Sequence, residues 1–154
     1  MNHWLLKTEP SSFGIEHLQA AAHRTTSWQG VRNYQARNLI RDQIKKGDHA
    51  FLYHSSCAQP GIAGTVRVVR AAYADKSAFD RDDPHYDAAS TAADPRWYTF
   101  DIKLVRRFKR VIGLDELRAH SQDALAGMML LRTGNRLSVT PVDDAHWRFI
   151  LSLE

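Results

Sequence analysis

Four short segments carry polar and aromatic side chains where a plain hydrophobic core would need neither. They are residues 7–10, 28–33, 53–56 and 136–139. Indole and phenol rings can stack on a flat heterocycle, and each stacked base contributes roughly 1–3 kcal/mol to binding. Polar side chains beside such rings can pair with the donors and acceptors on the edge of a base. The four segments together therefore favour a pocket for one nucleic-acid base.

The predicted roles within this pocket follow from side-chain chemistry. Trp28 and Tyr53 are the rings on which a base can stack, and we expect Trp28→Ala to weaken binding by about the stacking energy without unfolding the protein. The alternative is that both rings belong to the core and the polar groups cap loops, because aromatic side chains are usually buried for packing. The other predicted pocket residues supply hydrogen bonds or positive charge: Lys7, Glu9, Arg32, Asn33, His54, Ser55 and Ser138.

Basic residues gather in two places along the chain. The net charge is +4 and the isoelectric point is about 9.4, a modest excess that favours an anionic partner only slightly. Arginines and lysines cluster within residues 32–46 and 106–110, as they would on a surface that follows a phosphate backbone. The alternative is that both clusters are solvated faces. The predicted phosphate contacts are Arg37, Arg41, Arg106, Arg107 and Arg136.

The motifs of common enzyme classes are missing from the sequence. There is no Gly-x-Ser-x-Gly elbow, no glycine-rich phosphate loop and no His-x-x-x-His spacing, so we predict no catalytic residues, no cofactor and no metal site. His54 could act as a general base, because histidine titrates near neutral pH. Two alternatives to a binding module stay open. One is a base-modifying enzyme that uses His54 with Glu9 or Ser55, and the other is an adaptor whose basic face docks an acidic protein.

The hydrophobic pattern predicts a mixture of strands and helices. Asn33 can cap a helix over 34–46, where apolar residues fall at helical spacing before Gly47 stops it. Thr140 and Pro141 resemble the first positions of a closing helix. Residues 74–96 are polar and predict a long surface excursion with one short helical turn. The class is α+β, with a small curled sheet or partly open barrel flanked by helices. The other expected strands are 3–7, 49–54, 62–73 and 97–108, and the other expected helices are 15–22, 114–120 and 124–131.

Length and composition set the remaining expectations. A chain of 154 residues matches one domain, 1–154, that can hold a core without disulfides. Cys57 is the only cysteine, so no internal disulfide can form. The apolar run after Met1 is too short for a signal peptide, and no stretch is long enough to cross a membrane. We therefore expect a cytoplasmic protein with no membrane partner.

Several motifs occur in an order that is similar to the EVE domain family. They are Trp-Leu-Leu-Lys-Thr-Glu-Pro at 4–10, Trp-Gln-Gly-Val-Arg-Asn-Tyr-Gln-Ala-Arg-Asn at 28–38, Tyr-His-Ser at 53–55, Gly-Ile-Ala-Gly at 61–64, Arg-Trp-Tyr at 96–98 and Arg-Leu-Ser-Val-Thr-Pro-Val at 136–142. The resemblance implies a PUA-like fold and a pocket for a modified base, with 5-methylcytosine-type DNA bases and modified RNA bases both proposed for the family. It places the same nine residues named above in that pocket. The chain departs from the family pattern at Gly14 and Ala74, outside the proposed pocket.

Overall fold

A computed structural model describes residues 1–154 and contains one six-stranded sheet with the order β2-β5-β4-β3-β1-β6. β1 and β3 run parallel, and all other neighbours are antiparallel. This arrangement confirms the predicted α+β class. The strands are β1 (His3–Thr8), β2 (Thr25–Ser27), β3 (His49–His54), β4 (Gly61–Ala74), β5 (Tyr98–Gly113) and β6 (Val139–Val142). The helices are α1 (Ile15–Ala20), α2 (Tyr34–Asp42), α3 (Leu114–Arg118) and α4 (Asp144–Leu153), with short 3-10 turns at Ala22–Arg24, Lys76–Phe79 and Met129–Leu131.

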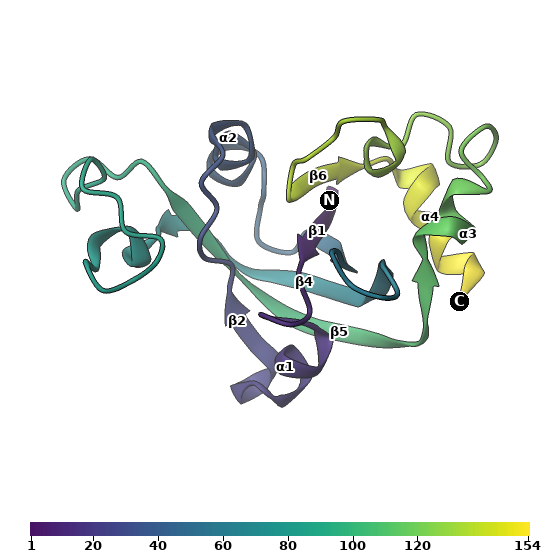
Figure 1. The fold of residues 1–154 in the computed structure, drawn as a ribbon, viewed down its shortest axis with the longest axis horizontal. Coiled ribbons are helices and arrows are strands. Elements are labelled where there is room, and N and C mark those ends of the chain that lie inside the picture. The colour runs from purple at the N-terminus through teal and green to yellow at the C-terminus, as the bar shows by residue number, and fades with distance from the viewer.

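The long hairpin of β4 and β5 forms the floor of the molecule in Figure 1 and carries the excursion between these strands to one end. The pairing between the two strands shifts register at several points. Such irregularities bend and twist a sheet, which lets this one curl around its own helices. Helices α3 and α4 lie together at the opposite end from the excursion. None of the helices combines the length and hydropathy needed to span a bilayer.

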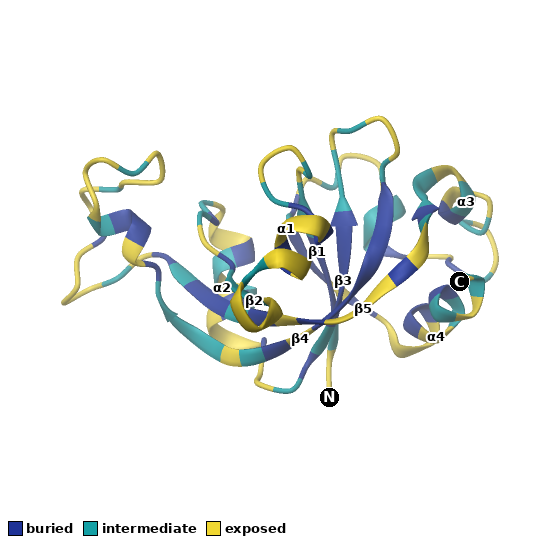
Figure 2. Ribbon diagram, turned by 90° about the horizontal axis from the view of Figure 1, so that it is seen from below, coloured by how far each residue is buried: buried dark blue, intermediate teal, exposed yellow.

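The sheet separates two hydrophobic clusters, because neighbouring residues of a strand point to opposite faces. In β3, Ala50 and Leu52 join a cluster with Trp28 and α2, whereas Phe51 and Tyr53 join a second cluster with α3 and α4. The strands at the centre of the sheet are accordingly buried on both faces (Figure 2). This division decides which side chains can meet in a site.

The structure corrects the prediction that Thr140 and Pro141 begin the closing helix. Both residues lie in β6, where they pair with Leu5 and Trp4 of β1. Proline is compatible with this position because β6 is an edge strand. The helix begins later, at Asp144. Without β6, one edge of β1 would have no hydrogen-bond partners. Pairing of β6 with this edge therefore outweighs the local pattern that favours a helix start.

Other boundaries differ from the sequence prediction for local reasons. Helix α2 ends at Asp42 rather than residue 46, and the following turn directs the Lys45 amide to the buried Asp48 carboxylate at 2.9 Å. Residues 124–131 form turns and a 3-10 turn instead of a helix. The short edge strand β2 was not expected, and it pairs with β5 through residues Thr25 to Ser27.

Candidate functional site

A cleft of about 510 Å³ opens beside Trp28, and we call it the Trp28 cleft. This volume lies in the range that holds small organic ligands. Six of the nine predicted pocket residues line it, and they come from the end of β1, the loop before α2 and the segment before β6. These six are Lys7, Glu9, Trp28, Arg32, Asn33 and Ser138.

Trp28 forms one wall of the cleft with little of its surface exposed. The residue is 8 % exposed and packs against Phe100 with ring centroids 6.3 Å apart. Its backbone amide donates to the Phe100 carbonyl at 2.8 Å, which extends the pairing of β2 with β5. The indole nitrogens of Trp4 and Trp97 donate to Asp48 and Asp87. That of Trp28 has no such protein acceptor, so Trp28 is a core residue that lines the cleft and keeps its N–H free to donate.

Asn33 is held in place by the helix that follows it. Its side-chain oxygen accepts a hydrogen bond from the Ala36 amide at 3.0 Å, which caps the N-terminus of α2 as predicted. The cap fixes the orientation of the carboxamide and leaves its two amide hydrogens without a protein acceptor. Asn33 can therefore donate to a carbonyl or ring nitrogen in the cleft.

The opposite side of the cleft is built by β1 and the segment that leads into β6. The Lys7 amide donates to the Ser138 carbonyl at 2.8 Å, so the two residues lie side by side. Burial lowers the pKa of Lys7, and its ammonium group makes no ion pair in the protein. Glu9 is exposed at the rim. This side of the cleft therefore offers a carboxylate and a serine hydroxyl, whereas Lys7 pairs with Tyr53 in the sheet and also lines a second hollow with that residue.

The buried carboxylate of Asp75 fixes the third side of the cleft. It accepts hydrogen bonds from the Gly30 amide at 2.9 Å, from Arg32 at 3.2 Å and from the Ser77 hydroxyl at 2.6 Å. Burial alone would raise the pKa of Asp75, but these hydrogen bonds lower it below its ordinary value. Arg32 also donates to the His85 carbonyl at 2.6 Å. The guanidinium of Arg32 therefore links Asp75 to the His85 carbonyl and stabilises the loop. It is not free to bind a phosphate.

Asp75 and His85 belong to the site and are not among the residues predicted from the sequence. His85 lines the cleft from within the polar excursion, and Asp75 anchors that excursion at its start. A signal for Asp75 was present, because Asp-x-Ser after a strand is typical of a turn in which the carboxylate accepts the second following amide. Its contacts with Gly30 and Arg32 cross more than forty residues and leave no local pattern.

Tyr53, His54 and Ser55 do not line the Trp28 cleft. Tyr53 is 3 % exposed, belongs to the second hydrophobic cluster and borders a separate hollow with Ser55, so it cannot stack on a base against Trp28. The physical reason is the alternation of β3, which sends Tyr53 to the face of the sheet away from Trp28. The structure therefore does not bring these two rings together around one cleft.

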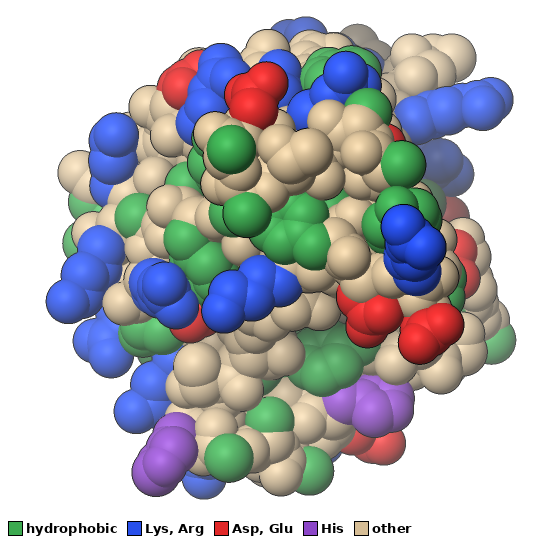
Figure 3. Space-filling model, turned by 90° about the vertical axis from the view of Figure 1, so that its left-hand side faces the viewer, with side chains coloured by type: hydrophobic (Ala, Val, Ile, Leu, Met, Phe, Trp, Pro, Cys, Tyr) green, Lys and Arg blue, Asp and Glu red, His purple; other side chains and the backbone are tan.

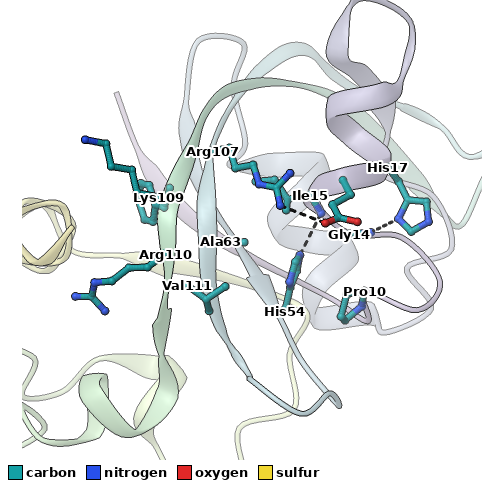
Figure 4. Close-up of a pocket in the computed structure, with 12 residues that line it drawn as sticks. Pro10, Gly14, Ile15, His17, His54, Ala63, Arg107, Lys109, Arg110 and Val111 are labelled. Carbon is teal, nitrogen blue, oxygen red and sulfur yellow. Dashed lines mark hydrogen bonds and ion pairs between the residues drawn. The ribbon is translucent and has the colours of Figure 1, made fainter.

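His54 lies in a third hollow, of about 390 Å³, between α1 and β5 (Figure 4). Its Nε2 accepts a hydrogen bond from the Ile15 amide at 3.1 Å, and Nδ1 of His17 accepts from the Gly14 amide at 2.8 Å. Two histidines thus cap the same short helix. Burial lowers the pKa of His54, and the neighbouring Arg107 lowers it further. His54 is accordingly held as a neutral acceptor.

Most of the arginines predicted to contact phosphates are engaged within the protein. Arg106 pairs with Glu154 at 2.6 Å, and Arg107 pairs with Glu16 at 3.2 Å. Arg41 pairs with Asp42 at 2.8 Å. Arg37 donates to the Arg96 carbonyl at 2.9 Å. Arg136 alone among the five makes no ion pair or side-chain hydrogen bond, and it lies in a hollow next to Asn33.

No group of three or more histidine, cysteine, aspartate or glutamate side chains is placed to hold a metal ion. The model of the EVE domain matches residues 2–153. The chain belongs to the EVE domain family. The resemblance found in its motifs is confirmed.

Named relatives of this EVE domain extend over nearly its whole length. It is 47 % identical over 167 residues to thymocyte nuclear protein 1 of Rattus norvegicus, covering 99 % of this chain and 74 % of the relative. A solved structure of a Pseudomonas putida protein is similar with a TM-score of 0.90 and 43 % identity, covering 98 % of each chain. A structure of human THYN1 protein in complex with 5-methylcytosine-containing DNA has a TM-score of 0.94 and 42 % identity, covering 99 % of this chain and 97 % of that one.

Proposed function

We propose that this EVE domain binds nucleic acid by accepting one everted, modified base in the Trp28 cleft, with 5-methylcytosine in DNA as the first candidate. The observation that carries the proposal is the cleft itself, which is lined by the indole of Trp28 and by the fixed carboxamide of Asn33. An extruded base is recognised by stacking and by hydrogen bonds to its edge. The human relative that was solved with 5-methylcytosine-containing DNA has the same fold.

The roles we infer for the cleft residues follow from their available groups. Trp28 supplies the apolar wall, Asn33 donates to a carbonyl or ring nitrogen, and Glu9 accepts from an exocyclic amino group. Lys7 is placed to contact a carbonyl or a phosphate, and Ser138 can serve either polarity. Arg32 acts on the base indirectly, because its ion pair with Asp75 holds the loop of residues 28–33.

We infer that the domain is a binding module rather than an enzyme. The catalytic alternative required His54 to act with Glu9 or Ser55. These three residues line three different hollows, and the Nε2 of His54 is occupied by the Ile15 amide. A general base must lie within hydrogen-bond reach of the proton that it takes. The geometry therefore gives His54 no substrate in the Trp28 cleft.

Two further expectations from the sequence stay predictions. One is that residues 1–154 act as a single domain, and the other is a cytoplasmic location. Thymocyte nuclear protein 1 carries the word nuclear in its name, so the location of this protein is best tested by imaging a fluorescent fusion.

The test is equilibrium binding to matched oligonucleotides. We expect the purified protein to bind a DNA duplex with one central 5-methylcytosine more tightly than the same duplex with cytosine, measured by fluorescence anisotropy. The same comparison on RNA decides which polymer is preferred. Equal affinity for modified and unmodified bases in every polymer would contradict the proposal, and binding to an acidic protein but to no nucleic acid would favour the adaptor alternative.

A further inference from the structure

We propose that a basic strip that begins at the border of the Trp28 cleft binds the phosphates that flank the everted base. The basic strip consists of Lys7, Arg118, Arg132 and Arg136. The inference rests on the proposed function and adds the path of the nucleic-acid backbone, which the cleft alone does not define. It also replaces the assignment of phosphate contacts to the arginines of β5.

Two hollows that border the cleft bring these four residues together. The Arg136 hollow, of about 410 Å³, runs from Asn33 at the start of α2 to the segment 129–137. The Tyr53 hollow, of about 530 Å³, runs from Lys7 past the same segment to α3. Asn33 and Lys7 also line the Trp28 cleft, so each hollow shares one residue with it. Figure 1 shows the segment before β6 lying between α2 and α3.

The charged side chains that line the two hollows are all positive. Arginine and lysine side chains line them, and no aspartate or glutamate does. Arg118 and Arg136 make no ion pair or side-chain hydrogen bond, and Arg132 donates only to the Gly127 carbonyl at 3.2 Å. All three arginines are exposed. Their positive charge is therefore not neutralised within the protein and is available to phosphate oxygens.

The arginines of β5 provide the contrast within the same molecule. Arg106, Arg107 and Arg110 pair with Glu154, Glu16 and Glu116. A phosphate that bound there would have to displace a carboxylate from each arginine. At the end of the molecule that carries the excursion and α2, aspartates and glutamates likewise lie among the lysines and arginines (Figure 3). The charge of these three β5 arginines is thus already neutralised within the protein.

The loop that carries Arg132 and Arg136 is fixed from within. Asn135 donates to the Met129 carbonyl at 2.7 Å and accepts from the Leu137 amide at 3.1 Å. Gly134 has a φ of +79°, a backbone conformation that favours glycine and lets the loop turn tightly. The two arginines therefore extend from a loop with a defined shape, which reduces the conformational entropy lost when phosphates bind.

The decisive experiment compares two double variants that remove the same charge. The basic-strip variant combines Arg118→Gln with Arg132→Gln and removes two positive charges from the strip. The β5 variant is the matched control and combines Arg106→Gln with Arg107→Gln. The two probes are a DNA duplex with one central 5-methylcytosine and the same duplex with cytosine at that position. Affinity is measured over a series of salt concentrations, because the slope of log K against log salt counts the phosphate contacts.

We expect the basic-strip variant to bind roughly tenfold more weakly and to lose about one unit of salt slope for each phosphate contact removed. Its preference for 5-methylcytosine over cytosine should stay that of the wild type, and the β5 variant should keep the wild-type slope. An unchanged slope in the basic-strip variant, or a reduced slope only in the β5 variant, would overturn the inference while the proposed function stands. A reduced slope in a protein that never prefers the modified base would contradict the proposed function and keep the basic strip.

Discussion

The carboxylate of Asp75 accepts a hydrogen bond from the backbone amide of Gly30 at 2.9 Å, joining two segments that lie far apart in the sequence. Gly30 has a φ of +84°, and a Cβ atom there would lie 2.6 Å from the His85 ring. The contact therefore fixes the loop before α2 against the start of the excursion. Both segments line the Trp28 cleft, so its shape depends on this one buried carboxylate.

We expect Asp75→Asn to lower the free energy of unfolding by roughly 3 kcal/mol, because it removes the charge that pairs with the partly buried Arg32. Chemical denaturation followed by tryptophan fluorescence measures this loss. The control is Asp42→Asn, which removes one carboxylate of an exposed pair and should cost less than about 1 kcal/mol. Equal effects in the two variants would show that Asp75 does not organise the cleft.

Trp28→Ala should destabilise the fold by roughly 3–5 kcal/mol, because the indole packs in the larger hydrophobic cluster. The burial of Trp28 therefore favours a loss of stability over the expectation that this substitution leaves the fold intact. Trp28→Phe is the cleaner binding variant, since it keeps an apolar ring and removes the indole N–H. We expect it to weaken binding of the 5-methylcytosine duplex by about fivefold, because the smaller ring covers less of the base and cannot donate a hydrogen bond. An affinity equal to that of the wild type would place the base elsewhere.

Asn33→Asp separates the two roles of Asn33. The aspartate can still cap α2, so the free energy of unfolding should change by less than about 0.5 kcal/mol. Its carboxylate cannot donate, so affinity for the modified base should fall by about tenfold or more. Asn33→Ala is the companion variant, which loses the cap as well and should cost about 1 kcal/mol of stability. If Asn33→Asp binds as tightly as the wild type, its carboxamide does not contact the base.

The protein should lose stability on acidification through His54. Because burial lowers the pKa of His54 in the folded state below its ordinary value of 6.5, the unfolded state binds the proton more readily. The stabilising contribution is fully present above pH 6.5 and is lost as the pH falls toward the folded-state pKa. Protonation also removes the acceptor for the Ile15 amide and adds a charge beside His17 and Arg107, with only Glu16 opposing it.

Thermal denaturation between about pH 7.5 and about pH 5 measures this effect, with His54→Gln as the comparison, and we expect a difference of order 1 kcal/mol at the acidic end. Burial lowers the pKa of His3 as well, so both proteins should lose some stability in acid. The difference between the two curves isolates His54. Parallel curves would show that the contact with Ile15 contributes nothing.

The elements that local pattern and spacing define were predictable from the sequence. The Asn33 cap, the strands β1, β3 and β4 and the polar excursion all follow from such patterns. Thr140 and Pro141 show where local reasoning fails, because a capping pattern also fits an edge strand once β1 needs a partner.

The candidate site was predictable only in part. Tyr53 and His54 are neighbours on one strand, so their side chains point to opposite faces and cannot both belong to one pocket. The alternation of a strand is predictable from the sequence. The motif at 53–55 nevertheless favours both residues as members of the site. The ion pairs of Arg106 and Arg107 depend on Glu154 and Glu16, which are far away in the chain. Only the folded structure separates these neutralised arginines from the unpaired ones of the basic strip.

The most direct test of the base-binding cleft is nuclear magnetic resonance of the tryptophan indole N–H groups during titration with a 5-methylcytosine oligonucleotide. Trp28 lines the cleft, whereas Trp147 packs in the second hydrophobic cluster and serves as an internal control. The proposal predicts that the Trp28 resonance shifts in proportion to saturation and that the Trp147 resonance stays in place. A saturated complex in which the Trp28 resonance has not moved would contradict it.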